Sequence, residues 1–399
     1  MKRTVSFNKN LFLLVCINLI LLVILLPSYG ISFVTSLMGN RFLVGLELVA
    51  IITLFGKYRG IITKHQLLYL IFCVYCAAVT LININIQHLA LYYWFSIVMI
   101  PFGVCFLAED TIISEDDINQ TIIIESFCSV IYASIVFLNF NSINKLVTAS
   151  TGTAVYYILT LLPFVLALKN KKIKVFLVLV VSISCLLTTK RTALIALVLS
   201  LLVYFDIESR KTKINWLIRF IRILLFVCVI IAGIYLAQDI FGIEIIDRMI
   251  GLKDDGGSYR SYIYEVVWDK YKESSLLDQI FGRGFNAVRY TMDIKTGYEH
   301  IGNAVSAHND FLEVLVDYGM VGLAMYLMII ITNVKLCFGA IKKKADLASP
   351  MAAALVIFTV LSLFSHLIIY PTYIMNLLVM WTIFRKKCQF DSLENDREV

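Results

Sequence analysis

The sequence predicts an all-α, polytopic integral membrane protein with about twelve transmembrane helices and one large external loop that contains short helices. Of its 399 residues, 60% are hydrophobic and only 16% are charged, whereas soluble proteins have about 45–50% and about 25%. The mean hydropathy is +0.84. Because even a large soluble domain leaves much of its surface in water, this apolar surplus requires a lipid environment. It excludes a soluble enzyme, a disordered tail, a collagen and a disulfide scaffold, and the small net charge of +7 argues against a nucleic-acid partner.

The transmembrane helices are placed by segment length, because a helix needs roughly 20 apolar residues to cross the hydrocarbon layer. The pair 174–206 has the length of one long helix, but Thr188-Thr189-Lys190-Arg191 interrupts it and predicts a tight hairpin. The segments that meet the length criterion are 11–28, 41–56, 66–84, 90–108, 121–140, 152–168, 174–189, 192–206, 217–237, 319–338, 349–368 and 370–384.

The basic residues predict the orientation, since cytoplasmic loops carry an excess of Lys and Arg. If the N-terminus is cytoplasmic, the cytoplasmic segments hold 23 of the 35 Lys and Arg residues. Short external segments hold only Arg41, Lys145, Lys190 and Arg191. One predicted cytoplasmic loop, Glu109–Asp117, is acidic, but acidic residues contribute little to this rule. We therefore expect both termini in the cytoplasm, with the first span retained as a helix rather than cleaved as a signal.

The predicted organisation has three parts. Residues 1–237 hold helices 1–9, residues 238–318 form an external, periplasmic loop, and residues 319–399 hold helices 10–12 and a cytoplasmic tail. The loop carries eight Lys/Arg against fourteen Asp/Glu and no cysteine, so it is acidic and has no disulfide framework. Cys73 and Cys76 lie mid-span, where packing explains them better than metal binding does.

The first half of the loop is predicted to contain a turn and a helix. Asp254-Asp255-Gly256-Gly257-Ser258 is a turn pattern. Apolar residues repeat at helical spacing from Tyr259 to Tyr271, and Ser258 is the expected N-cap.

The second half contains a further turn and helix. Phe281-Gly282-Arg283-Gly284-Phe285 predicts a turn, and Asp310 with Glu313 forms a capping-box pattern. The helix that begins there is expected to reach about Tyr318, where Gly319 and Gly322 mark the joint with the next span.

His308 stands beside this predicted helix start. A helix N-terminus attracts phosphate and disfavours imidazolium, so a neutral His308 that accepts a proton is expected at neutral pH. The alternative is a histidine that caps or hydrogen-bonds the loop.

External basic residues form the second candidate set. Arg191 and Lys190 are exceptions to the positive-inside pattern at the external end of a hairpin, where the alternative is interfacial snorkelling. Arg260 opens the amphipathic helix and has Asp254 or Asp255 as an alternative partner. Arg283 and Arg289 are weaker candidates, because loop arginines are usually solvated.

Together these residues suit one kind of chemistry. Guanidinium groups bind two phosphoryl oxygens of a diphosphate, and a neutral histidine suits deprotonation of a sugar hydroxyl. The glycines beside Asp254 and Asp255 favour a turn over a metal site. The sequence has neither a P-loop nor a dinucleotide motif, so no nucleotide, metal or other cofactor is expected.

These residues resemble a known family, the O-antigen ligase and O-antigen/capsule polymerase superfamily. The signature His-Asn-x-x-Leu-Glu followed by Tyr-Gly-x-x-Gly is matched by His308–Gly322, and the family's hairpin arginine by Arg191, although Ile195 stands where the family has leucine. Arg260 matches an arginine that opens the first loop helix, and Phe281–Phe285 matches a Gly-x-Gly-Phe turn. The motifs cover about residues 188–325, whereas the first 150 residues match only in hydropathy.

The resemblance implies a GT-C-like fold and a glycosyltransferase of the bacterial inner membrane. Such enzymes transfer a glycan from an undecaprenyl-diphosphate donor to a sugar hydroxyl at the outer face, without nucleotide or metal and with inversion. By this resemblance His308 is the base, and Arg191 and Arg260 hold the diphosphate. Lys190, Arg283, Arg289 and Asn309 are implied contacts to the donor or glycan. A chain-length regulator is a possible partner protein of such enzymes.

Two alternatives stay open. A polymerase joins one lipid-linked repeat to another, whereas a ligase moves the finished chain to lipid A–core, and both share these motifs. We favour a polymerase, because the loop is short and nothing in it identifies a lipid A–core acceptor. A lipid-linked oligosaccharide transporter is the third hypothesis, but transporters usually have internal repeats and midplane polar residues, and the single late loop breaks any repeat.

Overall fold

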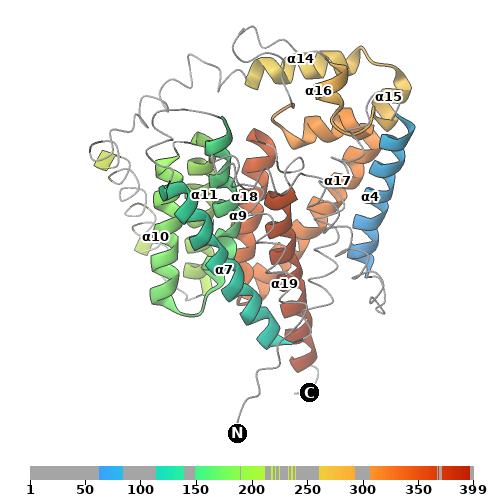
Figure 1. Ribbon diagram of the computed structural model, residues 1–399. Helices are drawn as coiled ribbons and strands as arrows, with labels where there is room; N and C mark the ends of the chain where they lie inside the picture. Colours follow the sequence, from blue (N-terminus) through green and yellow to red (C-terminus); the bar gives the residue numbers. More distant parts are fainter. Residues whose placement is uncertain are drawn as a thin grey trace, which may run out of the picture.

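The computed structural model is a bundle of α-helices with a small helical cap at one end (Figure 1). It describes residues 63–83, 114–138, 149–188, 190–211, 260–292, 306–365 and 371–395, with isolated positions between 217 and 239 and Leu367. All regular elements in these residues are helices, which confirms the predicted all-α class. The bundle helices are α4 (Lys64–Ile82), α7 (Glu115–Leu138), α9 (Ala149–Ala167), α10 (Lys171–Leu187), α11 (Arg191–Lys211), α17 (Asp310–Lys343), α18 (Ala348–Phe364) and α19 (Pro371–Asn395).

These helices agree with the spans predicted for the same parts of the chain. The hairpin is confirmed, since α10 ends at Leu187 and α11 begins at Arg191. Among the described residues, α4, α11 and α17 are long and apolar enough to cross a membrane. The predictions for 11–28, 41–56 and 90–108, and most of 217–237, lie outside the described residues. Differences occur at the ends: α19 continues to Asn395, past the predicted end at 384.

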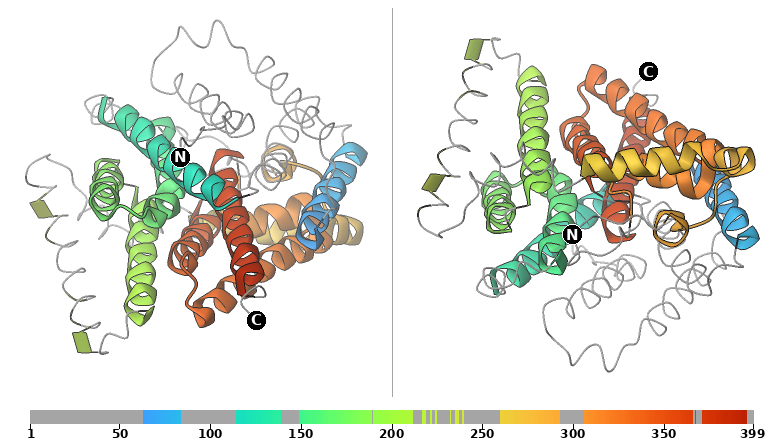
Figure 2. Two further views of the ribbon diagram at one scale, coloured as in Figure 1. Left: turned by 90° about the horizontal axis from the view of Figure 1, so that it is seen from below. Right: turned by 90° about the horizontal axis from the view of Figure 1, so that it is seen from above.

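The bundle is arranged around α9 and α18. The helix pair α7 and α10 packs on α9, α11 packs along α18, and α17 lies between α18 and α4. Figure 2 shows the same grouping from both ends of the bundle. The core is mainly apolar, with Trp381, Phe358 and Tyr326 in successive aromatic contact, and it also buries polar side chains such as Glu125 and Asn376.

Helix ends that were predicted to be cytoplasmic meet at one end of the bundle. Lys387 of α19 pairs with Glu115 at the start of α7. Lys211 at the end of α11 bonds Glu208 at 2.8 Å and the carbonyl of Asp346, before α18, at 2.9 Å. Helix ends predicted to lie on the same side of the membrane are therefore at the same end of the bundle. The assignment of this end to the cytoplasm stays a prediction.

The cap at the opposite end is formed by α14 (Arg260–Lys272), α15 (Leu276–Phe281) and α16 (Ala287–Thr291). Figure 2, seen from above, shows α14 lying across the bundle. The predicted amphipathic helix is confirmed from Arg260 onward, with Ile263, Val267 and Tyr271 buried. Ser258, its expected N-cap, and the predicted turn at 254–258 lie outside the described residues.

A glycine-lined joint connects the cap to the bundle. α17 is kinked at Gly319, where φ is 66° and ψ is −170°. A Cβ at Gly319 would lie 2.3 Å from the carbonyl oxygen of Ile280, and one at Gly282 would lie 2.3 Å from that of Asp317. The Tyr75 hydroxyl of α4 is 3.0 Å from the carbonyl oxygens of both Phe281 and Tyr318. The predicted turn at Phe281–Phe285 and the predicted joint at Gly319 are thus parts of one contact.

Gly319→Ala should strongly destabilise the protein. The new methyl group would overlap the Ile280 carbonyl, and φ of 66° is strained for alanine. Gly339→Ala in the same helix is the control, because no atom lies within 4 Å of its added Cβ, and there alanine should gain about 0.5–1 kcal/mol of helix stability. Unfolding temperatures of both variants in detergent measure this. Equal temperatures would show that the joint tolerates a side chain.

Candidate active site

His308 lies in the turn immediately before α17. Its φ of 52° is in the left-handed region, which non-glycine residues seldom adopt. The Asn309 side chain caps α17 by accepting the N–H groups of Phe311 at 2.9 Å and Leu312 at 3.2 Å. The predicted cap, Asp310, is therefore wrong by one residue. Asn309 has the extended backbone that turns its side chain toward these N–H groups, whereas Asp310 is already helical.

Two buried carboxylates fix the chain on either side of this turn. Asp310 accepts the N–H of Leu367, which follows α18, at 3.0 and 3.2 Å. Glu313 accepts the N–H of Ala307 at 2.6 Å. The capping-box pairing predicted for Asp310 and Glu313 is thus replaced by hydrogen bonds to main-chain groups outside the helix, which anchor the chain at Ala307 and Asp310, on either side of His308.

Cationic residues from two distant segments lie near His308. The Arg260 guanidinium donates to the Thr192 hydroxyl at 3.1 Å, which places the start of α14 against the start of α11. Thr192 follows Arg191, the half-buried first residue of α11. Arg260 and Lys190 both act electrostatically on His308. The fold therefore brings the hairpin, the first cap helix and the histidine turn to one place.

The imidazole of His308 is neutral at pH 7. Burial, followed by the positive charges of Arg260 and Lys190, lowers the pKa of His308 to about 4. Neutrality was predicted from the helix N-terminus alone. The structure places desolvation first and the two cations second, both of which disfavour imidazolium.

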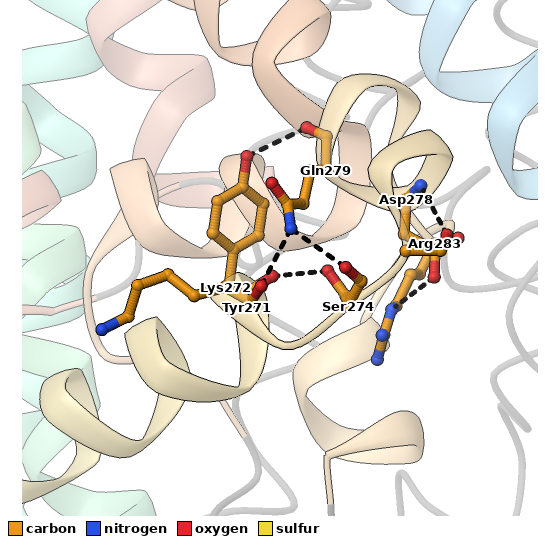
Figure 3. A network of polar contacts seen from close by, with 7 residues as sticks. Tyr271, Lys272, Ser274, Asp278, Gln279 and Arg283 are labelled. Atoms are coloured by element: carbon orange, nitrogen blue, oxygen red, sulfur yellow. Dashed lines mark hydrogen bonds and ion pairs between the residues drawn. The ribbon is translucent and has the colours of Figure 1, made fainter.

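Arg283 and Arg289 occupy other parts of the cap. The Arg283 Nε atom is 3.3 Å from the Asp278 carboxylate, and this ion pair lies next to the network of Tyr271, Ser274 and Gln279 (Figure 3). Arg289 is exposed on α16. A glycan contact by either residue remains a prediction. The proposed alternative partners of Arg260, Asp254 and Asp255, lie outside the described residues.

The sequence reasoning missed Asp317. Its two carboxylate oxygens accept the N–H groups of Asn286 and Ala287, each at 2.8 Å, and its carbonyl accepts that of Gly284 at 2.8 Å. The signal was present in the sequence, since Asp317 follows Glu313 by four residues and so shares its helix face. Asp317 fixes the α16 turn to α17.

Comparison with known proteins identifies the segment that carries this site. A sequence model of the family described as O-antigen ligase matches residues 175–327. No curated protein matches the chain. The matched segment includes Lys190, Arg191, Arg260 and His308. The resemblance inferred from the motifs is confirmed over this part of the chain.

Asp317→Ala should lower the free energy of unfolding by about 2–6 kcal/mol, since two buried N–H donors would each lose an acceptor at a cost of roughly 1–3 kcal/mol. Asp269→Ala is the control, because Asp269 is half-exposed and pairs only with exposed Lys272 among the contacts described. That change should cost less than about 1 kcal/mol. Chemical unfolding of both variants in detergent tests the difference, and similar losses would contradict the anchoring role.

Proposed function

We propose that this protein is a bacterial polysaccharide polymerase, since a sequence model described as O-antigen ligase matches residues 175–327. It joins undecaprenyl-diphosphate-linked repeats at the outer face of the inner membrane. The observation that supports this most directly is that the half-buried His308 lies in the field of Arg260 and Lys190, which come from separate segments and disfavour imidazolium. A neutral base beside fixed cations suits transfer of a sugar from a diphosphate to a hydroxyl.

The proposed reaction is a single displacement at the anomeric carbon of the donor sugar. His308 removes the proton from the acceptor hydroxyl as its oxygen forms the new bond to that carbon. The bond from the carbon to the diphosphate oxygen breaks, and its electron pair leaves with the diphosphate. Inversion follows from attack opposite the leaving group. No nucleotide or metal takes part in the proposed step.

Arg260, Arg191 and Lys190 are proposed to bind the diphosphate. Guanidinium groups bond two phosphoryl oxygens at once, and their charge stabilises the negative charge that grows on the leaving group. The contact from Arg260 to Thr192 supports this role, because it holds Arg260 beside the helix start that carries Arg191. A bound diphosphate would also offset the two charges that lower the pKa of His308, so the base would gain proton affinity when the donor is present.

A gel of surface polysaccharide from a deletion strain tests the polymerase assignment. Loss of a polymerase should leave glycan capped by single repeats. A ligase deletion would instead leave bare core with accumulated lipid-linked polymer, and a transporter deletion would leave no transferred repeat. Either of these patterns would contradict the proposal and identify the alternative.

His308→Ala should reduce polymer formation at least about 100-fold, the usual size of a general-base contribution. Arg191→Gln should also reduce polymer formation, because the charge on the leaving diphosphate would be less stabilised. The controls are His65→Ala and Arg210→Gln, which change the same residue types near the opposite end of the bundle. Polymer is measured against the amount of each variant in the membrane. Normal polymer from His308→Ala would refute the proposed base.

Lys190→Met should raise the pKa of His308, because it removes one of the two charges that disfavour imidazolium. The base works only when neutral, so wild-type kcat/KM should hold above about pH 4 and decline as the pH falls through that value. In the variant this decline should begin at higher pH. Lys335→Met, an exposed lysine far along α17, should leave the profile unchanged. An unchanged profile for Lys190→Met would contradict the electrostatic contact.

A further inference from the structure

Tyr264 connects three parts of the cap and the bundle. Its hydroxyl lies 3.0 Å from the carbonyl oxygen of His308 and 2.9 Å from that of Leu363, near the end of α18. Tyr264 itself belongs to α14 and is half-buried. A single phenol thus links the first cap helix, the histidine turn and the end of a bundle helix.

The position of Tyr264 on α14 relates His308 to Arg260. Arg260 and Tyr264 are four positions apart, so they lie on the same face of α14, one turn from each other. Arg260 contacts Thr192 at the start of α11, and Tyr264 contacts the main chain of His308. One rigid helix therefore sets the separation between a proposed diphosphate ligand and the proposed base.

The main chain of His308 needs such support. A non-glycine residue with φ of 52° is in an uncommon conformation that persists only where surrounding contacts maintain it. Glu313 holds the preceding N–H of Ala307, and the Asn309 side chain caps the following helix. The Tyr264 hydroxyl is the contact to the carbonyl of His308 itself.

The phenol has one proton and faces two carbonyl acceptors. The Leu363 carbonyl has a second donor, the side-chain N–H of Asn309 at 3.3 Å. The phenol can therefore donate its one proton to the His308 carbonyl. Burial raises the pKa of Tyr264, which keeps the phenol protonated at any working pH. Phenylalanine would preserve the ring and remove the hydroxyl, with its contacts to the His308 and Leu363 carbonyls and to the Asn309 side chain.

We propose that Tyr264 is a positioning residue for glycosyl transfer, which orients His308 relative to Arg260 through its hydrogen bond to the His308 carbonyl. The inference rests on the proposed role of His308 as the base. Because Tyr264 acts through the histidine, its loss should slow the chemical step and leave donor binding nearly intact.

The test compares Tyr264→Phe with Tyr262→Phe in the purified full-length enzyme, with an undecaprenyl-diphosphate-linked repeat as substrate. Tyr262 lies on the same helix and is 47% exposed, so its variant makes the same chemical change away from His308. For Tyr264→Phe we expect kcat to fall about tenfold, the effect of losing one ordinary hydrogen bond, with KM for the donor within about twofold. Tyr262→Phe should match the wild type in both constants.

An unchanged kcat for Tyr264→Phe would overturn the inference, whether or not KM for the donor changes. So would a lower unfolding temperature with normal kcat per folded molecule. The last result would mean that Tyr264 serves folding alone. His308→Ala in the same assay separates this failure from failure of the proposed function. If His308→Ala is inactive and Tyr264→Phe is fully active, only the positioning role is wrong. If His308→Ala is fully active, or the wild type makes no polymer, the proposed function fails and the inference fails with it.

Discussion

The close approach of two backbones at Gly282 and Gly319 is the constraint on which the site depends. The carbonyl oxygens of Ile280 and Asp317 occupy the space that a Cβ at the opposing glycine would need. The kink at Gly319 sets the direction of the first turns of α17. Those turns begin at the His308 turn, so a side chain at the joint would move His308, the proposed base, relative to the hairpin and α14.

The acidic residues of α17 act on the main chain. Asp310, Glu313 and Asp317 are each almost fully buried, and each accepts N–H groups from a segment outside the helix. Main-chain N–H groups thus supply hydrogen-bond partners to these buried carboxyl groups. Near this anchored turn, burial and then the charges of Arg260 and Lys190 lower the pKa of His308.

Among the described residues, hydropathy was sufficient to predict the bundle helices. The motifs also named segments that lie near one another in the fold, those of Lys190, Arg260 and His308, while their part in catalysis stays a prediction. Prediction from the sequence failed where the outcome depends on contacts between distant segments. Nothing local distinguishes Asn309 from Asp310 as the cap, since both residue types cap helices well; the extended backbone of Asn309 decides it. Tyr264 was not singled out from the sequence, because its hydroxyl contacts the carbonyls of His308 and Leu363, and Leu363 is 99 positions away. The ion pair of Arg283 with Asp278 was also not predicted, and a glycan contact by Arg283 stays a prediction.

The most direct test of the proposed mechanism is a reaction with purified protein in lipid discs, with undecaprenyl-diphosphate-linked repeats as the only sugar substrate and EDTA present. The glycosidic bonds formed and the undecaprenyl diphosphate released are both measured. We predict a ladder of polymer lengths with one undecaprenyl diphosphate released for each new bond. No release, or release only after addition of lipid A–core, would contradict a polymerase that uses His308 and its neighbouring cations without a metal.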